Sequence, residues 1–217
     1  MSKEKDQAQN KESPISRRSF LKGVGTGAVA ATVAPTVLVG SEKLAEAQQM
    51  GEGITRAKIK LNINDKVYEV EIEPRTTLLS VLRDGIDATG KRIDLTGAKS
   101  ICDRGECGGC TVEVAGKVVY SCMMLAIDAQ GKQITTVEGL AKGDGLHPVQ
   151  EAFIQHDAMM CGFCTPGFVV AAKSLLDENP GPSLEEIKVG LTGNICRCGT
   201  YPFIFQAVKT ASRKMGG

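Results

Sequence analysis

The sequence predicts an α+β chain in which strands and one helix come first and helices alone follow. Alternation of apolar and polar side chains in the first part favours strands, and apolar residues three and four positions apart in the second part favour helices. A length of 217 residues, 42% of them hydrophobic, is enough for one or two buried cores. We therefore expect two domains, over residues 57–139 and 140–213.

The first domain is expected to begin with a hairpin and a helix. Residues 58–63 alternate, a turn follows at residues 64–65, and residues 67–72 alternate again, which is typical of two paired strands. Residues 77–84 have helical spacing, and Gly85 stands where a C′ glycine would close the helix.

A second hairpin is expected after a cysteine-rich loop. Its strands cover residues 110–114 and 118–122, joined by a turn at Ala115-Gly116, and a last short strand covers residues 134–137.

Four short helices are expected in the second domain. They begin near Pro148, Pro166, Ser183 and Tyr201, and the last runs to about Arg213. Proline suits the first turn of a helix because it lacks the amide proton that would have no partner there. The serine is followed three residues later by a glutamate, as in a capping box.

Residues 1–47 are predicted to be an export signal, followed by a linker over residues 48–56. The run Ser16-Arg17-Arg18-Ser19-Phe20-Leu21-Lys22 resembles the twin-arginine motif, and Ala45-Glu46-Ala47 offers a small-x-small cleavage site. The apolar stretch Gly23–Gly40 is too weak for a stable membrane span, which needs about 20 strongly apolar residues. A basic amphipathic helix is the alternative. Because the twin-arginine route carries proteins that have already folded, we expect a periplasmic protein that receives its cofactors in the cytoplasm.

The charge balance gives no reason to expect nucleic acid or an anionic membrane as a partner. The whole chain carries 26 basic and 25 acidic side chains, a net charge of +1. Residues 1–47 hold 7 of the basic and 5 of the acidic groups, so the mature chain would have 19 and 20, a net charge of −1. Binding to a phosphate backbone needs a clear positive excess.

The eight cysteines form two groups of four with different spacing. The first group is Cys102-x4-Cys107-x2-Cys110-x11-Cys122, which has the plant-type spacing of a [2Fe–2S] site. Glycines within the loop allow it to curl and direct backbone amides toward anionic sulfur.

The second group is Cys161-x2-Cys164 and, after 31 residues, Cys196-x-Cys198. Its spacing alone leaves several alternatives open: structural zinc, disulfides, buried thiols or a second iron–sulfur cluster. Zinc sites more often have two-residue gaps in both pairs, which argues mildly against zinc.

Three segments resemble motifs of one family, the molybdenum hydroxylases, which include xanthine oxidase and aldehyde oxidoreductase. They are Cys102-Asp103-Arg104-Gly105-Glu106-Cys107-Gly108-Gly109-Cys110-Thr111-Val112, Cys161-Gly162-Phe163-Cys164-Thr165-Pro166-Gly167 and Gly193-Asn194-Ile195-Cys196-Arg197-Cys198-Gly199-Thr200-Tyr201. The resemblance implies an N-terminal β-grasp ferredoxin-like domain and an all-α four-helix domain, each with one [2Fe–2S] cluster. It assigns the first cysteine group to one cluster and the second group to the other.

The resemblance also implies a function and partners. A large molybdopterin-binding subunit would hold the catalytic site, and this chain would relay single electrons to an FAD-binding subunit or a cytochrome. The second cluster would lie nearest the pterin, with Cys198 approaching it. The exported layout favours an aldehyde as the substrate over an N-heterocycle. The alternatives are a free-standing periplasmic carrier with two clusters and a non-redox secreted protein with four disulfides.

Two positions differ from the family pattern. Met160 stands where relatives usually have a glutamine that hydrogen-bonds the pterin, and a thioether cannot donate a hydrogen bond. Phe203-Ile204-Phe205 replaces a usual Arg-Ile-Arg. Both changes replace polar donors with apolar side chains. Either the contact with the catalytic subunit, where Met160 and Cys198 would face the pterin, is built differently, or the pterin is held more by its own subunit.

The chain offers no catalytic constellation of its own. Of its two histidines, His147 precedes Pro148 at the entry of an expected helix and His156 lies on that helix, and both are interpreted as structural. No Gly-x-Gly-x-x-Gly segment predicts a dinucleotide site. A cluster of Met159, Met160, Phe163 and Phe168 forms either a docking face or packing beneath the second cysteine group.

Overall fold

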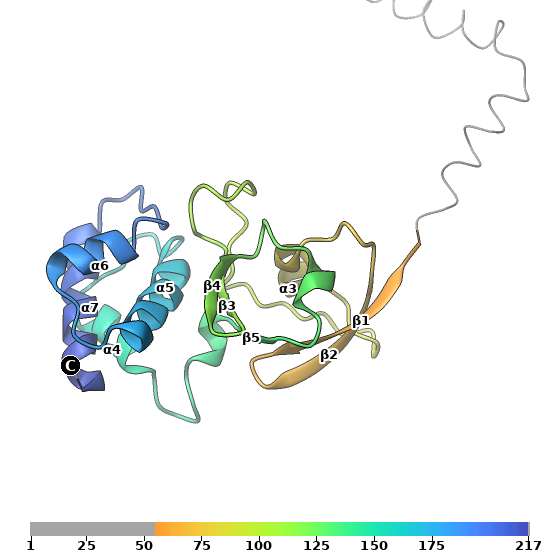
Figure 1. Ribbon diagram of the computed structural model, residues 1–217, viewed down its shortest axis with the longest axis horizontal. Helices are drawn as coiled ribbons and strands as arrows, with labels where there is room; N and C mark the ends of the chain where they lie inside the picture. The colour runs from red at the N-terminus through yellow and green to blue at the C-terminus, as the bar shows by residue number, and fades with distance from the viewer. Residues whose placement is uncertain (1–54, 217) are drawn as a thin grey trace, which may run out of the picture. The chain divides into compact units, whose positions relative to one another are not determined.

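Residues 55–216 are described by the computed structural model, and they belong to one compact unit (Figure 1). This part of the chain contains a five-stranded sheet and five α-helices, which confirms the predicted combination of strands and helices. The twin-arginine motif and the cleavage site lie outside the described residues. Among residues 55–216, no helix has the length and apolar character needed to cross a bilayer.

The first hairpin is formed as predicted. Strands β1 (Ala57–Ile63) and β2 (Lys66–Ile72) pair antiparallel, with Ile63 opposite Lys66 at the turn. Asn64 and Asp65 have φ angles of 51° and 63°. Two consecutive left-handed residues match the right-handed twist of the flanking strands, and asparagine and aspartate tolerate this conformation better than most residues.

The second hairpin repeats this solution. Strands β3 (Thr111–Val114) and β4 (Lys117–Tyr120) are joined by Ala115 and Gly116, with φ angles of 51° and 75°. Strand β5 (Gln133–Thr135) lies between the hairpins, parallel to β1 and antiparallel to β3, so the order is β2-β1-β5-β3-β4. The short strand β5 therefore joins two local hairpins into one sheet.

Helix α3 (Leu78–Asp84) begins as predicted but ends for a different reason. The Thr77 hydroxyl accepts the Ser80 amide proton at 3.2 Å and caps the helix. Gly85 closes the helix as predicted, because its amide donates to the Val81 carbonyl oxygen at 2.9 Å, but its φ angle of −59° is not left-handed. A Cβ at this position would lie 2.4 Å from the Val81 carbonyl oxygen, so glycine is required there by space.

Four further helices follow. They are α4 (Pro148–Gln155), α5 (Thr165–Glu178), α6 (Leu184–Gly190) and α7 (Tyr201–Met215). The capping box before α6 is present, because the Ser183 hydroxyl accepts the Glu186 amide proton and the Glu186 carboxylate accepts the Ser183 amide proton. Two short 3₁₀ helices, η1 (Ala126–Ala129) and η2 (Val137–Gly139), were not predicted.

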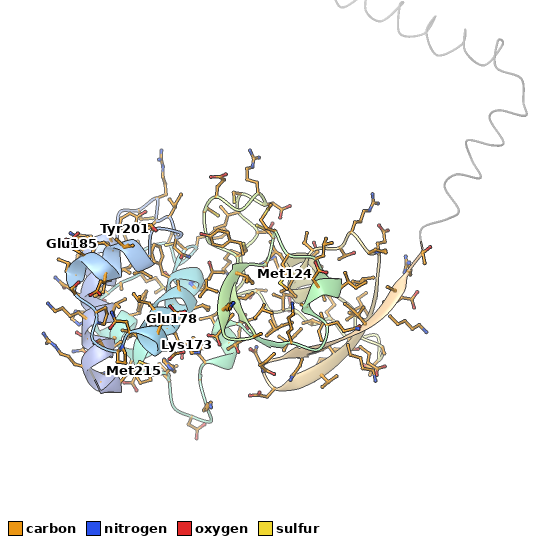
Figure 2. The ribbon with its side chains drawn as sticks, viewed as in Figure 1. Met124, Lys173, Glu178, Glu185, Tyr201 and Met215 are labelled. Atoms are coloured by element: carbon orange, nitrogen blue, oxygen red, sulfur yellow. The ribbon has the colours of Figure 1, made fainter. Side chains whose placement is uncertain are left out.

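Two buried apolar cores lie within this unit. The first collects side chains from the sheet and α3, and its buried members run from Ile59 to Ile134. The second collects side chains from the last four helices, and its buried members run from Leu140 to Ala211. Helix α5 packs against β3 and β4. Lys173 on α5, labelled in Figure 2, forms an ion pair with Glu113 of β3 at 2.7 Å.

Two leucines, one buried and one exposed, test the second apolar core, which is formed by the last four helices. Leu176 is 1% exposed within it, whereas Leu184 is 44% exposed at the start of α6. We expect Leu176→Ala to lower the free energy of unfolding by about 2–5 kcal/mol, because it leaves a cavity. Leu184→Ala should change it by roughly 0.5 kcal/mol or less. Urea denaturation of both variants measures the difference, and equal losses would contradict the assignment of this core.

Candidate metal centres

The first cysteine group surrounds one end of the β3–β4 hairpin. Cys110 directly precedes β3 and Cys122 follows β4 by two positions, so strand pairing brings these two buried residues together. Ser121 reinforces the pairing, because its hydroxyl donates to the Cys110 carbonyl at 2.7 Å. Cys102 and Cys107 lie in the loop before β3 and are partly exposed.

The loop curls so that main-chain amides face sulfur. Asp103, Gly105 and Gly108 have φ angles of 53°, 75° and 69°, which turn the chain back on itself. The pKa of the Cys102 thiol is lowered to about 7, chiefly because the Arg104 amide donates to it, with further donation around Glu106. Donors that favour a thiolate also favour a metal-bound thiolate.

Burial acts in the opposite direction on Cys110. Desolvation raises the pKa of Cys110 to about 12, and the neighbouring Cys122 thiol contributes to the shift. Cys107 lies beside Cys102 in the same way and contributes to the lowered pKa of Cys102. The first group is therefore organised as two pairs.

The second group is assembled from two separate segments. Cys161 and Cys164 precede α5, with Cys164 at the N-cap, whereas Cys196 and Cys198 lie between α6 and α7. The thiols of Cys164 and Cys196 lie close enough to affect each other's pKa, and Cys161 acts in the same way on Cys198. These contacts cross between the segments, so the second group is again two pairs.

Electrostatics differ within the second group. Burial raises the pKa of Cys164 to about 12. Burial also acts to raise the pKa of Cys196, but donors outweigh it and bring the value to about 7. The strongest of these is the Thr200 hydroxyl, whose oxygen lies 2.7 Å from the Cys196 sulfur.

The paired arrangement fits a binuclear cluster better than a single metal ion. All eight cysteines are free thiols, so none is held in a disulfide. A [2Fe–2S] cluster takes four cysteines, two on each iron, which matches two pairs in each group. The donor set, thiolates with inward-facing amides, also suits that cluster.

The two residues expected to face a pterin are both exposed. Met160 is 62% exposed beside Cys161, and Cys198 is also exposed. The expected cluster of two methionines and two phenylalanines is divided. Met159, Met160 and Phe163 are exposed, whereas Phe168 is fully buried and packs edge-on against Tyr201.

The segment that departs from Arg-Ile-Arg is also divided. Ile204 is buried in the helical core, Phe203 is 44% exposed, and Phe205 is partly buried beside Tyr201. The exposed Phe203 adds to the apolar surface near the second group.

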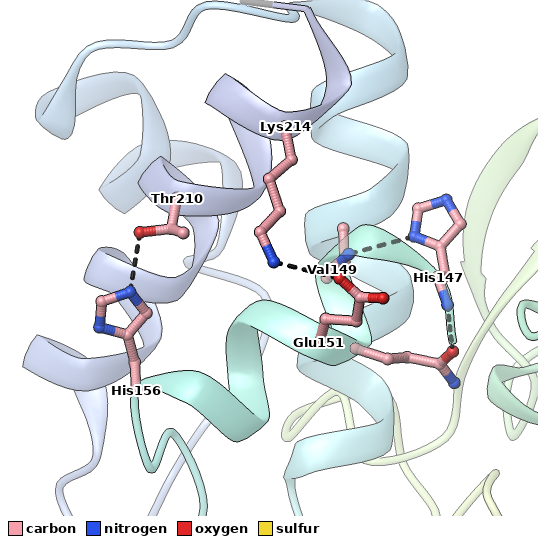
Figure 3. Close-up of polar contacts among 7 residues, drawn as sticks. His147, Val149, Glu151, His156, Thr210 and Lys214 are labelled. Atoms are coloured by element: carbon pink, nitrogen blue, oxygen red, sulfur yellow. Dashed lines mark hydrogen bonds and ion pairs between the residues drawn. The ribbon is translucent and has the colours of Figure 1, made fainter. Parts of the chain in front are cut away.

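Both histidines make structural contacts (Figure 3). The ring of His147 accepts the Val149 amide proton at 3.3 Å at the start of α4. His156 Nε2 lies 2.7 Å from the Thr210 hydroxyl oxygen of α7. Near them, Lys214 and Glu151 form an ion pair at 3.1 Å. Each histidine thus connects or caps helices.

Sequence reasoning gave no role to Asn194, Thr200 or Tyr201. Thr200 donates toward Cys196, and the Tyr201 hydroxyl oxygen accepts the Cys196 amide proton at 2.8 Å. Asn194 is buried and donates to Gly108. A polar residue within a cysteine motif is the signal that could have marked all three.

Comparison with known proteins gives consistent results. Residues 136–209 match a family model described as a [2Fe-2S] binding domain. The chain is 42% identical over 161 residues to the nicotine 6-hydroxylase small subunit of Paenarthrobacter nicotinovorans, covering 74% of this chain and 93% of that one. It is 36% identical over 214 residues to the aldehyde oxidoreductase iron–sulfur-binding subunit PaoA of Escherichia coli O157:H7, covering 91% and 88%.

A solved structure has the same fold. Quinoline 2-oxidoreductase from Pseudomonas putida 86 superposes with a TM-score of 0.68 and 38% identity, covering 74% of this chain and 98% of that chain. Identity and coverage at this level show common family membership. The chain therefore belongs to the small iron–sulfur subunits of the molybdenum hydroxylases, the family of aldehyde oxidoreductase and xanthine dehydrogenase.

Proposed function

We propose that this chain carries two [2Fe–2S] clusters and relays single electrons from a molybdopterin site on a large partner subunit to an FAD-binding subunit or a cytochrome. The proposal rests on one observation. In each group the four cysteines form two neighbouring pairs, and hydrogen-bond donors face their sulfur atoms. Such clusters exchange one electron at a time, at potentials set by hydrogen bonds to sulfur and by exposure.

The ligands and domains follow from this proposal. Cys102, Cys107, Cys110 and Cys122 hold one cluster in a β-grasp ferredoxin-like domain over residues 57–139. Cys161, Cys164, Cys196 and Cys198 hold the other in a four-helix domain over residues 140–213. The two separate apolar cores support this division.

The second cluster is the one that faces the catalytic subunit in this proposal. Its ligands Cys161 and Cys198 are exposed, whereas Cys110 and Cys122 of the first group are buried. Exposed Met160 and Phe163 add an apolar surface beside them. An exposed apolar surface around exposed metal ligands supports a permanent partner that covers both. Met160 and Cys198 would then contact the pterin region.

An aldehyde is the proposed substrate of the complex. The match to the Escherichia coli aldehyde oxidoreductase subunit covers 91% of this chain. Residues 55–217 make up 163 of 217 residues, about three-quarters, so that alignment extends into the first 54 residues. The likeness to an aldehyde oxidoreductase subunit therefore includes part of the segment that we interpret as an export signal. Nicotine 6-hydroxylase and quinoline 2-oxidoreductase, whose names specify N-heterocycles, represent the other substrate class.

A periplasmic location, reached by the twin-arginine route, completes the proposal. It rests on the arginine pair at Arg17 and Arg18 in the leader. A chain that already holds its clusters has to cross the membrane folded.

Metal analysis tests the two clusters. We expect about four iron and four acid-labile sulfide per chain in the protein isolated from its native host, since each cluster contains two of each. Stoichiometric zinc, or a metal-free chain with disulfides, would contradict the proposal.

Single-ligand variants test the independence of the clusters. We expect Cys198→Ser to perturb one of two reduced-cluster EPR signals and Cys122→Ser to perturb the other, because each thiolate belongs to a different group. Simultaneous loss of both signals in Cys198→Ser would show that the clusters are not independent.

The apolar surface near the second group is tested by introducing charge. We expect Met160→Arg to reduce copurification of the molybdenum-bearing subunit about tenfold or more, because an unpaired charge would be buried in the contact. Val189→Arg is the control, since Val189 is 69% exposed on α6 outside the cysteine-bearing segments. Equal effects would argue against this docking face. Isolation of the unaltered chain alone would favour a free-standing carrier.

A further inference from the structure

The two cysteine-bearing loops touch through their main chains. The Ile195 amide donates to the Cys107 carbonyl oxygen at 2.9 Å. Cys107 belongs to the first group, and Ile195 directly precedes Cys196 of the second. One hydrogen bond therefore connects a proposed ligand of one cluster to the neighbour of a proposed ligand of the other.

Glycines allow this close approach. A Cβ on Gly108 would lie 2.4 Å from the Gly193 carbonyl oxygen, and a Cβ on Gly167 would lie 2.3 Å from the Gly108 carbonyl oxygen. Real Cβ atoms do not approach oxygen this closely, so a side chain at Gly108 would force the two loops apart, and one at Gly167 would push the start of α5 away from the first loop. The contact is thus one of backbone against backbone.

Asn194 spans the contact with its side chain. It is 5% exposed, and its Nδ2 donates to the Gly108 carbonyl oxygen at 2.9 Å and to the Thr111 hydroxyl oxygen at 3.2 Å. The Thr111 hydroxyl donates in turn to the same Gly108 carbonyl at 2.6 Å. The partners of Asn194 follow Cys107 and Cys110 directly in the sequence.

A second side chain reaches the same loop from the first cysteine group. The Tyr120 hydroxyl, two positions before Cys122, donates to the Gly193 carbonyl oxygen at 2.7 Å. The Lys173–Glu113 ion pair lies elsewhere, because it connects the middle of α5 to β3. Asn194 differs from Tyr120 in that its side chain bonds directly to the residues that follow Cys107 and Cys110.

We propose that Asn194 is a positioning residue that fixes the spacing of the two cysteine loops, and thereby of the two clusters that they would hold. This inference rests on the proposed function, because it requires both clusters. With both clusters bound, Cys161, Cys164, Cys196 and Cys198 would hold the donor and Cys102, Cys107, Cys110 and Cys122 the acceptor of a single electron, whose passage would need no bond to be made or broken.

The chemistry of the amide suits this role. Its NH₂ group offers two protons, one for each acceptor, and carries no charge in a buried site. Aspartate would place acceptors and a charge against the Gly108 carbonyl oxygen, which is costly in a buried position. Alanine would leave the two loops joined without the side-chain bridge.

EPR spectroscopy of the fully reduced complex tests the inference. The complex is isolated with its native partners from wild type, Asn194→Ala, Thr111→Val and Lys173→Met. The measurements are iron content, the two cluster signals, and the magnetic splitting between them, which depends on cluster separation. We expect Asn194→Ala to keep its iron and both signals but to lose the resolved splitting. Lys173→Met should retain the wild-type splitting, because it breaks a contact away from the cysteine loops.

The outcomes separate this inference from the proposed function. Wild-type splitting in a fully iron-loaded Asn194→Ala variant would overturn the positioning role. An equal loss of splitting in Lys173→Met would also overturn it, because breaking a contact away from the cysteine loops would then have the same effect as removing the Asn194 side chain. If Asn194→Ala fails to fold, Thr111→Val decides: it removes one acceptor of Asn194 with little change of shape, and unchanged splitting counts against the role. A wild-type complex with only one cluster signal would refute the proposed function itself.

Discussion

The need to surround anionic sulfur with hydrogen-bond donors explains much of this structure. Four thiolates in one place repel each other unless metal ions and amide protons compensate their charge. In the first group this need requires a loop that turns through left-handed residues at Asp103, Gly105 and Gly108. In the second group it is met by the Thr200 hydroxyl beside Cys196. The strands and helices hold these loops in place: β3 and β4 bring Cys110 and Cys122 together, and α5 begins at Cys164.

Features that depend on neighbouring residues could be predicted from the sequence. The turn at Asn64 and Asp65 and the capping box at Ser183 and Glu186 need only a few adjacent residues, and both are present. The spacing of the cysteines indicated two groups. Gly85 was placed correctly at the end of α3 but for the wrong reason, because its requirement for space comes from Val81 and Ile93 rather than from its own φ angle.

Features that depend on distant residues could not be predicted in this way. Nothing in residues 133–135 alone indicates that β5 lies between β1 and β3. The pairing of Cys161 with Cys198, and of Cys164 with Cys196, requires α6 and α7 to place the second segment beside the first. Asn194 acts on Gly108, 86 positions away, so its contacts became visible only when the loops were brought together.

The uneven exposure of the cysteines has a consequence for the lifetime of the chain in air. Cys110 and Cys122 are shielded by the sheet, whereas Cys161 and Cys198 are open to small oxidants. Accessible thiolates are oxidised first, and oxidation beyond the sulfenic acid is not readily reversed. In a subunit without its partner, Cys161 and Cys198 would therefore be oxidised first, whereas Cys110 and Cys122 would be spared. In the proposed complex, a partner that covers Cys161 and Cys198 would therefore also protect them chemically.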